Sequence, residues 1–240
     1  MNLLDFIPER GSEKRVVQDN ALISAAYTLT LQEKRLLLLG ISKVGQNDYK
    51  HRHTEDFFFT VTNKEWQDVF KISDKNSYND MKKAAKLLWD RSILIKQSDE
   101  RIKLRWVTAC GYNDGEASIS LQFNPIIMAH LSGMLDEFTS YKLLSVSGLK
   151  SIHSIRIYEL ASQFVNTGVR VLSVDELKEM LALSDSYSSY ADLKRYVLDK
   201  SVAEISSKTD IKLTWKPIKM GRKVVSIRFN VKKKDQIEMF

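Results

Sequence analysis

The 240-residue sequence has only one cysteine, three prolines and four histidines, and these shortages exclude several classes of protein. Cys110 is the single cysteine, so an intramolecular disulfide framework is impossible and the chain fits a reducing compartment. No run of about 20 apolar residues occurs, so the sequence predicts no membrane-spanning helix. The first fourteen residues contain three acids and lack the basic start and apolar core of a signal peptide. We therefore predict a cytoplasmic protein without a membrane partner.

Sequence signatures of common enzymes are absent as well. The chain has no Gly-x-x-x-x-Gly-Lys-Ser/Thr loop for nucleotide hydrolysis, and neither Gly-x-Ser-x-Gly nor His-Glu-x-x-His occurs. Enzymes that nick DNA hold a metal with a His-x-His pair among apolar residues, whereas His51-Arg52-His53 lies in a polar loop. His130 and His153 are isolated. We predict no catalytic residue, no metal site and no cofactor, and keep DNA nicking as the distant alternative.

Positive charge is concentrated in the C-terminal part of the chain. The net charge is +7; residues 1–136 hold 19 Lys+Arg against 18 Asp+Glu, whereas residues 137–240 hold 18 against 12. Residues 211–234 contain no acid and nine bases, namely Lys212, Lys216, Lys219, Arg222, Lys223, Arg228, Lys232, Lys233 and Lys234. Such a stretch repels itself unless a polyanion lies against it, and DNA phosphates are the polyanion that we expect. The alternative is a solvated basic edge that keeps the protein soluble.

A repeated passage organises the chain. Residues 73–82 read SDKNSYNDMK, and residues 184–194 read SDSYSSYADLK. Each copy follows a β-rich run and a short helix pattern, and each precedes a longer basic helix pattern and two strands. This order of helix, turn, helix and hairpin is typical of a winged-helix module. We predict an α+β fold of two pseudo-symmetric winged-helix domains that grip two successive stretches of DNA.

The N-terminal winged-helix domain is predicted over residues 16–136, after a flexible tail of residues 1–15. Dimerisation and DNA contact are expected of this domain. Its helices are expected at residues 19–27, 30–44, 63–70 and 77–91, and its strands at residues 57–61, 93–97, 103–112 and 117–123. The last three strands are expected to form the wing.

Particular residues fix the ends and the environment of these helices. Thr28 or Thr30 is expected to cap the second helix, with Glu33 completing a capping box with Thr30. Asn63 is expected to cap the short helix that follows the first strand. The run Leu36 to Leu39 predicts a buried core helix. A leucine zipper is the alternative, but too few leucines follow its seven-residue spacing.

The C-terminal winged-helix domain is predicted over residues 137–240 and is expected to supply the main grip on DNA. Its helices are expected at residues 151–166, 175–182 and 187–206, and its strands at residues 169–174, 211–215 and 224–231. Asp175 is expected to cap the short helix. The segment from Lys216 to Lys223 is the basic tip of the second wing, expected to hold backbone phosphates while the helix reads sequence.

The candidate DNA-binding residues lie on the two recognition helices and the second wing, because the N-terminal part of a recognition helix reaches base edges in the major groove. In the N-terminal domain they are Lys75, Asn76, Ser77, Asn79, Lys82, Lys83 and Lys86. In the C-terminal domain they are Ser188, Ser189, Lys194, Arg195, Lys200, Lys216, Lys219, Arg222 and Lys223. The core face of the second recognition helix is predicted to include Tyr190, Leu193, Tyr196, Val197, Val202 and Ile205.

Three segments resemble a known family. Residues 16–37 contain Asn-x-Leu, a small-residue turn with Tyr-x-Leu, and then Glu-Lys-Arg before a leucine-rich helix. Residues 154–160 read SIRIYEL, and residues 221–229 read GRKVVSIRF. These segments are similar to those of the iteron-binding plasmid replication initiators, and the resemblance extends over about residues 16–231.

The resemblance implies a specific function. Members of this family have two winged-helix domains, and their monomers bind direct repeats, called iterons, at a plasmid origin. Bound monomers help to open an adjacent A·T-rich segment and recruit the host initiator and replicative helicase. Dimers joined through the N-terminal domain commonly repress the initiator's own promoter and limit copy number.

The sequence departs from the family pattern at the second recognition helix. Relatives are richer in arginine there, whereas residues 188–195 supply mainly serine and lysine beside Arg195. Lysine is a point charge that lacks the bidentate fork of arginine, so the bases that are read can differ. The loop of residues 45–57 is a second variable segment, next to the expected dimer contact. A winged-helix transcriptional regulator without initiator activity is the alternative function, and such a regulator expects one palindromic operator instead of tandem repeats.

Overall fold

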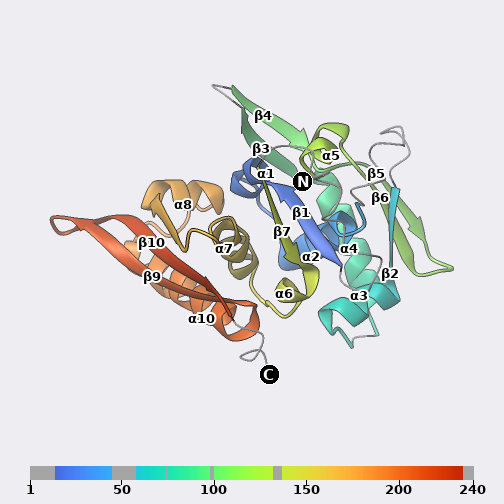
Figure 1. Ribbon diagram of the computed structural model, residues 1–240. Coiled ribbons are helices and arrows are strands. Elements are labelled where there is room, and N and C mark those ends of the chain that lie inside the picture. The colour runs from blue at the N-terminus through green and yellow to red at the C-terminus, as the bar shows by residue number, and fades with distance from the viewer. Residues whose placement is uncertain (1–13, 45–57, 74, 98–99, 132–136, 235–240) are drawn as a thin grey trace, which may run out of the picture.

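The protein consists of two helical units, and each unit carries a projecting β-hairpin (Figure 1). The first hairpin pairs β3 (Ser92–Gln97) with β4 (Glu100–Arg105), and the second pairs β9 (Ile211–Met220) with β10 (Lys223–Lys233). Helix and hairpin therefore follow one another in both halves of the chain, as the repeat predicts. The computed structural model describes residues 14–44, 58–73, 75–97, 100–131 and 137–234.

The first unit opens with strand β1 (Arg15–Asp19), helix α1 (Asn20–Ser24) and helix α2 (Leu31–Ile41). β1 occupies the end of the predicted tail and the start of the predicted helix at residue 19, so both predictions are corrected. Four of its five side chains are buried, so no alternation of polar and apolar residues revealed the strand. The predicted capping box is confirmed, because the Thr30 hydroxyl accepts a hydrogen bond from the Glu33 N–H at 3.3 Å.

A continuous hydrophobic core extends through both units. It includes Leu36 to Leu39 of α2, which are fully buried, so α2 is a core helix and the leucine-zipper alternative fails. Trp66 and Trp106 are also fully buried, whereas Trp89 is 40% exposed. Leu193 and Ile227 belong to the same core in the second unit. Burial of this apolar surface is the main stabilising contribution to the fold.

Strand β2 (Phe58–Thr62) leads directly into helix α3 (Asn63–Phe70), and α4 (Ser77–Asp90) follows. Thr62 caps α3 by accepting a hydrogen bond from the Glu65 N–H, so the prediction that Asn63 is the cap is wrong. The carboxamide oxygen of Asn63 accepts instead from the Ser77 hydroxyl at 2.8 Å. This bond ties the start of α3 to the start of α4.

The strand predicted over residues 103–112 is two strands that belong to different sheets. β4 ends at Arg105, and β5 (Val107–Asn113) begins after Trp106 and pairs with β6 (Ser118–Phe123) in a sheet of order β2-β6-β5. The buried Trp106 divides them, since its N–H donates to the Arg91 carbonyl and its carbonyl accepts from Asn124. The first wing is therefore the β3–β4 hairpin alone, and the prediction of a three-stranded wing is corrected.

Three elements near the middle of the chain were not predicted. They are helix α5 (Pro125–Leu131), strand β7 (Phe138–Lys142) and helix α6 (Leu143–Ser147). β7 pairs antiparallel with β1, with Val17 opposite Ser140. This pairing joins chain segments on both sides of the domain boundary that we predicted near residue 136.

The second unit follows the predicted order with shifted ends. Helix α7 (Ile152–Ser162) stops before residue 166, strand β8 (Val169–Ser173) follows, and helix α8 (Val174–Met180) comes next. Ser173 caps α8 in a capping box with Glu176, so the prediction of Asp175 as the cap is wrong. A serine directly before the helix satisfies the first N–H groups as well as aspartate does.

The second recognition helix is one helical run with an irregular middle. It consists of α9 (Tyr190–Asp192), a π-helix (Leu193–Leu198) and α10 (Asp199–Lys208), so it begins and ends later than the predicted 187–206. β8, β10 and β9 form a sheet in that order beside it. β9 extends to Met220, well beyond the predicted end at residue 215. Most of the predicted basic tip is therefore a regular strand.

A buried polar network joins α2 and the segment before it to α7. The Lys34 ammonium lies 2.8 Å from the Glu159 carboxylate, and both side chains are fully buried. Arg156 donates to the Tyr27 hydroxyl at 2.7 Å and to the Ala25 carbonyl at 2.9 Å. Burial alone would raise the pKa of Glu159, but the attraction of Lys34 and Arg156 holds that pKa below its usual value. Two of the three segments that carry the family resemblance thus meet inside the molecule.

The first hairpin also lies against the second unit. Arg101 of β4 forms an ion pair with Glu179 of α8 at 3.1 Å, whereas the Leu94 N–H of β3 donates to the Ala26 carbonyl at 3.1 Å within the first unit. Figure 1 shows this hairpin beside α1 and α8, whereas β9–β10 extends away from the body of the molecule. The two hairpins therefore have different surroundings.

Candidate nucleic-acid interface

Helix α4 presents most of its predicted DNA-binding side chains to solvent. Lys75, Asn76, Asn79, Lys83 and Lys86 are exposed, in accord with a basic outer face. The opposite face of α4 is buried, and the split arises because its apolar residues recur every three or four positions. These five residues stay predicted DNA contacts.

Two predicted residues of α4 are engaged inside the protein. Ser77 is buried, its hydroxyl donates to Asn63, and it accepts a hydrogen bond from Gln67 at 2.7 Å. Ser77 therefore offers no free side chain to DNA. Lys82 forms an ion pair with Asp114 of the β5–β6 turn at 2.8 Å, and its hydrogen bond lowers the pKa of that carboxyl. Because that carboxylate competes with phosphate for the ammonium, Lys82 must leave Asp114 before it can contact DNA.

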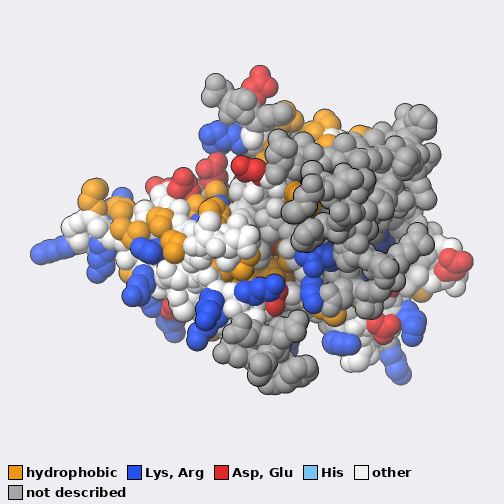
Figure 2. Space-filling view, viewed as in Figure 1, with side chains coloured by type: hydrophobic (Ala, Val, Ile, Leu, Met, Phe, Trp, Pro, Cys, Tyr) orange, Lys and Arg blue, Asp and Glu red, His pale blue; other side chains and the backbone are white. Residues whose placement is uncertain are grey.

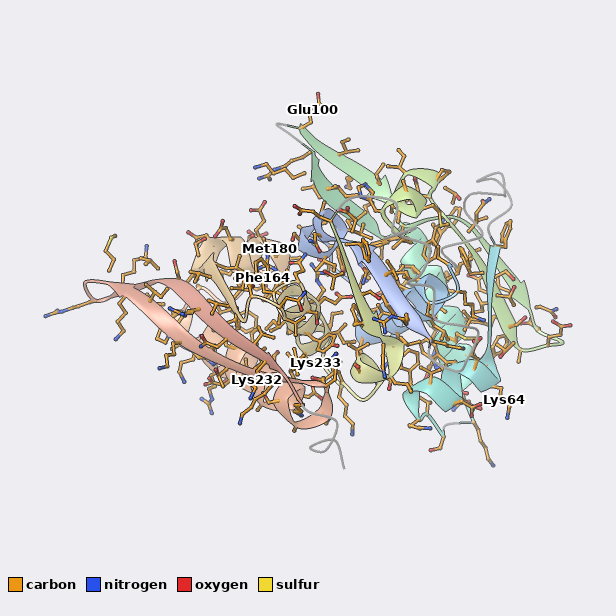
Figure 3. All side chains as sticks on the ribbon, viewed as in Figure 1. Lys64, Glu100, Phe164, Met180, Lys232 and Lys233 are labelled. Atoms are coloured by element: carbon orange, nitrogen blue, oxygen red, sulfur yellow. The ribbon has the colours of Figure 1, made fainter. Side chains whose placement is uncertain are left out.

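The first hairpin has a basic outer face with acidic partners. Arg101, Lys103 and Arg105 alternate along β4 and are exposed. Arg101 pairs with Glu179, and Arg105 pairs with Asp90 at 3.2 Å. Figure 3 shows Glu100 at the tip of this hairpin. Acidic side chains thus partly offset the positive charge of the first wing.

The start of the second recognition helix combines free and engaged side chains. Ser188 is exposed, whereas the Ser189 hydroxyl caps α9 by accepting from the Ala191 N–H at 3.1 Å. Lys194 forms an ion pair with Asp199 at 2.7 Å and also lies over the Trp215 ring. Arg195 and Lys200 are exposed. All five predicted positions therefore lie at the surface, but Ser189 has a helix-capping role and Lys194 is paired.

Tyr196 was placed on the wrong face of this helix. It was predicted to be a core residue, yet 43% of its surface is exposed, between Arg195 and Lys200. The nearby Tyr187 ring stacks on it with centroids 6.5 Å apart. Helical periodicity of 3.6 residues assigned Tyr196 to the core, and the π-helix breaks that periodicity.

The second hairpin carries the densest free positive charge. Lys216, Lys219, Arg222 and Lys223 are exposed, and within the described part of the chain none of them forms an ion pair. Lys232 and Lys233 add charge near the end of β10 that is remote from the tip (Figure 3). Figure 2 shows Lys and Arg side chains along this hairpin, while Asp and Glu side chains gather over α8. The hairpin is therefore a cationic arm suited to contact with phosphates.

The remaining predictions concern a metal site, DNA nicking and a membrane span. Among the described residues, no group of three or more His, Cys, Asp or Glu side chains is placed to hold a metal ion. His51 and His53, on which the nicking alternative rested, lie outside the described residues, as does the variable loop of residues 45–57. No helix in the described ranges is long and apolar enough to span a membrane.

Sequence families identify the two units. A family described as "Initiator Replication protein, WH1" matches residues 15–162, and one described as "Initiator Rep protein, WH2" matches residues 173–231. The two-domain winged-helix prediction is thereby confirmed. The WH1 match extends past the boundary that we placed near residue 136 and includes α7, so that boundary stays a prediction.

Individual proteins show the same similarity. The chain is 26% identical to the PI protein of Escherichia coli, across 94% of this chain and 85% of that protein. It is 25% identical to a replication initiation protein of Escherichia coli, across 95% of this chain and 72% of that protein. Among solved structures, the Pi initiator protein in complex with iteron DNA matches with a TM-score of 0.79 at 24% identity, covering 94% of this chain and 99% of that one. That structure supports the fold.

Proposed function

Because the chain belongs to the initiator replication protein family, we propose that it starts plasmid replication by binding direct repeats, iterons, at an origin. The proposal is supported by the sequence similarity of the chain to the PI protein. It is also supported by the similarity of its fold to the Pi initiator protein, which was crystallised with iteron DNA. No catalytic step belongs to this function. Its ligand is double-stranded DNA, so we place the protein in the cytoplasm with its plasmid.

The observation that carries the proposal is the fixed arrangement of two recognition helices and one free cationic hairpin. Arg156 donates to the Met180 carbonyl at 2.9 Å and Arg101 pairs with Glu179 at 3.1 Å, and these contacts hold the part that matches WH1 against the part that matches WH2. Two recognition helices held in this way can enter successive major grooves on one side of a duplex. The β9–β10 hairpin adds contacts to the backbone, which strengthen binding without regard to sequence.

The same proposal assigns two further activities. Bound monomers open the origin and recruit the host initiator and helicase, whereas dimers formed through the N-terminal domain repress the initiator's own promoter. These assignments rest on the family. The alternative, a regulator without initiator activity, shares the DNA contacts and differs in the architecture of its site.

A titration with DNA from the region that flanks the gene tests the proposal. Fluorescence anisotropy is measured at fixed salt with duplexes that carry one direct repeat, tandem direct repeats or an inverted repeat. Saturation at one chain per direct repeat is the expected result. Binding to the inverted repeat alone, as a dimer, would contradict the initiator function and support the alternative, a transcriptional regulator.

A further inference from the structure

The two recognition helices differ by one residue. In α4 the buried residues Met81 and Ala84 are separated by two positions, Lys82 and Lys83. In the second helix the buried residues Leu193 and Val197 are separated by three, namely Lys194, Arg195 and Tyr196. After this point the two buried patterns correspond, since Ala84, Ala85 and Leu88 match Val197, Leu198 and Ser201. The second helix therefore carries a single extra residue relative to the first.

The π-helix accommodates the extra residue. Its backbone hydrogen bonds span five residues instead of four, since the Asp199 N–H donates to the carbonyl of Lys194. Leu193 and Val197 are both buried in the core, so the extra residue lies on the solvent-exposed face of the helix. Three consecutive side chains are exposed there, and Tyr196 is the large apolar one among them. Short π segments often mark functional positions in helices.

The surroundings of Tyr196 limit how it can contact DNA. The Arg195 guanidinium and the Lys200 ammonium lie 5.4 and 5.3 Å from its ring centroid, and Tyr187 stacks on it. Because these groups occupy positions over the ring, stacking on a base is disfavoured and the ring edge is left to make contact. An apolar edge between two cations fits a major groove, where the cations face phosphates and the edge meets a thymine methyl.

We propose that Tyr196 is a base-reading residue of the C-terminal recognition helix and recognises thymine through its C5-methyl group. This inference rests on the proposed function, because it requires the helix to enter the groove of a bound repeat. It adds an apolar contact that partly replaces the arginine contacts in which this helix is poor.

The test replaces thymine by uracil, one position at a time, in a duplex that carries one direct repeat, because uracil lacks only the methyl group. Affinities of the full chain and of its variants Tyr196→Phe and Tyr196→Ala are measured by anisotropy. The wild type should lose about fourfold at one position, the effect of one buried methyl-sized group. Tyr196→Phe should keep that loss, whereas Tyr196→Ala should bind thymine and uracil duplexes equally. Tyr196→Gln, which keeps a long side chain at this exposed position, replaces Tyr196→Ala if the alanine variant does not fold.

The outcomes separate this inference from the proposed function. If the wild type fails to bind the repeat at all, the proposed function fails. If it binds the repeat but no uracil substitution weakens binding, or the alanine and glutamine variants keep the same penalty, the role of Tyr196 is overturned. Lys64→Met, an exposed change on α3, is the matched control and should leave the uracil profile unchanged.

Discussion

The two hairpins occupy equivalent places in the repeated fold, yet their environments differ. The β3–β4 hairpin bonds to its own domain through Leu94 and Ala26, and it contacts the second domain through the ion pair of Arg101 with Glu179. β9–β10 extends into solvent with Lys219, Arg222 and Lys223 near its tip and no acid in its sequence. We propose from this comparison that one copy of the repeated module joins the domains and the other contacts DNA, in line with their different charge.

The largest effect is expected at the buried ion pair between α2 and α7. Lys34→Met leaves Glu159 buried without its closest cation and should lower the free energy of unfolding by about 3–5 kcal/mol. Urea denaturation followed by circular dichroism measures this. Lys64→Met, which removes a lysine from an exposed pair with Asp68, is the control and should change stability little. Equal stability of the two variants would show that the buried pair between α2 and α7 does not stabilise the fold.

The next effect concerns DNA affinity. Changing Lys219, Arg222 and Lys223 together to glutamine should weaken binding to all sequences and reduce the salt slope by about 2.7, since each lost phosphate contact removes about 0.9. The matched control changes Lys96, Arg101 and Lys103 of the first hairpin to glutamine, which removes the same charge. Affinity measured between about 50 and 200 mM salt distinguishes them. Equal salt slopes for both triple variants would show that the two hairpins contribute equally to phosphate binding.

A smaller effect tests the contact between the first hairpin and α8. Arg101→Glu places a carboxylate opposite Glu179, and Glu179→Arg in the same chain restores an opposite pair. Because both side chains are about half exposed, the coupling energy should be about 0.2–1 kcal/mol and should shrink as salt rises. A double-mutant cycle of urea denaturation measures it. Additive single effects would mean that this ion pair does not contribute.

The smallest effect is a pH dependence from the second domain. Burial lowers the pKa of His153 on α7, so the unfolded chain binds a proton more readily than the folded one. Stability should therefore be constant well above the ordinary histidine pKa of about 6.5 and should fall as the pH drops below it. His153→Gln should remove this part of the slope in denaturation curves between about pH 7.5 and 5.5. The same slope in the variant would assign it to another group.

Much of this fold could be predicted from the sequence, and the failures have physical causes. The capping box at Thr30 and Glu33 is local, so residue types alone identified it. β1 was missed because four of its five residues are buried and leave no alternating pattern, whereas β7 alternates but buries the polar Thr139 and exposes Phe138. Tyr196 was misplaced because a one-residue insertion shifts the helical period. Ser77 was misassigned because its bonds to Asn63 and Gln67 depend on tertiary packing.

The most direct test of the unequal hairpins uses the single cysteine of the chain. In a Cys110→Ala background, Glu100→Cys places one thiol at the tip of the first hairpin and Met220→Cys places one near the tip of the second. Each thiol is labelled with iron-EDTA, and DNA cleavage is mapped on a duplex with one direct repeat. We predict strong, localised cleavage from position 220 and weak cleavage from position 100. Equal cleavage from both positions, or stronger cleavage from position 100, would contradict the assignment of DNA contact to the second hairpin.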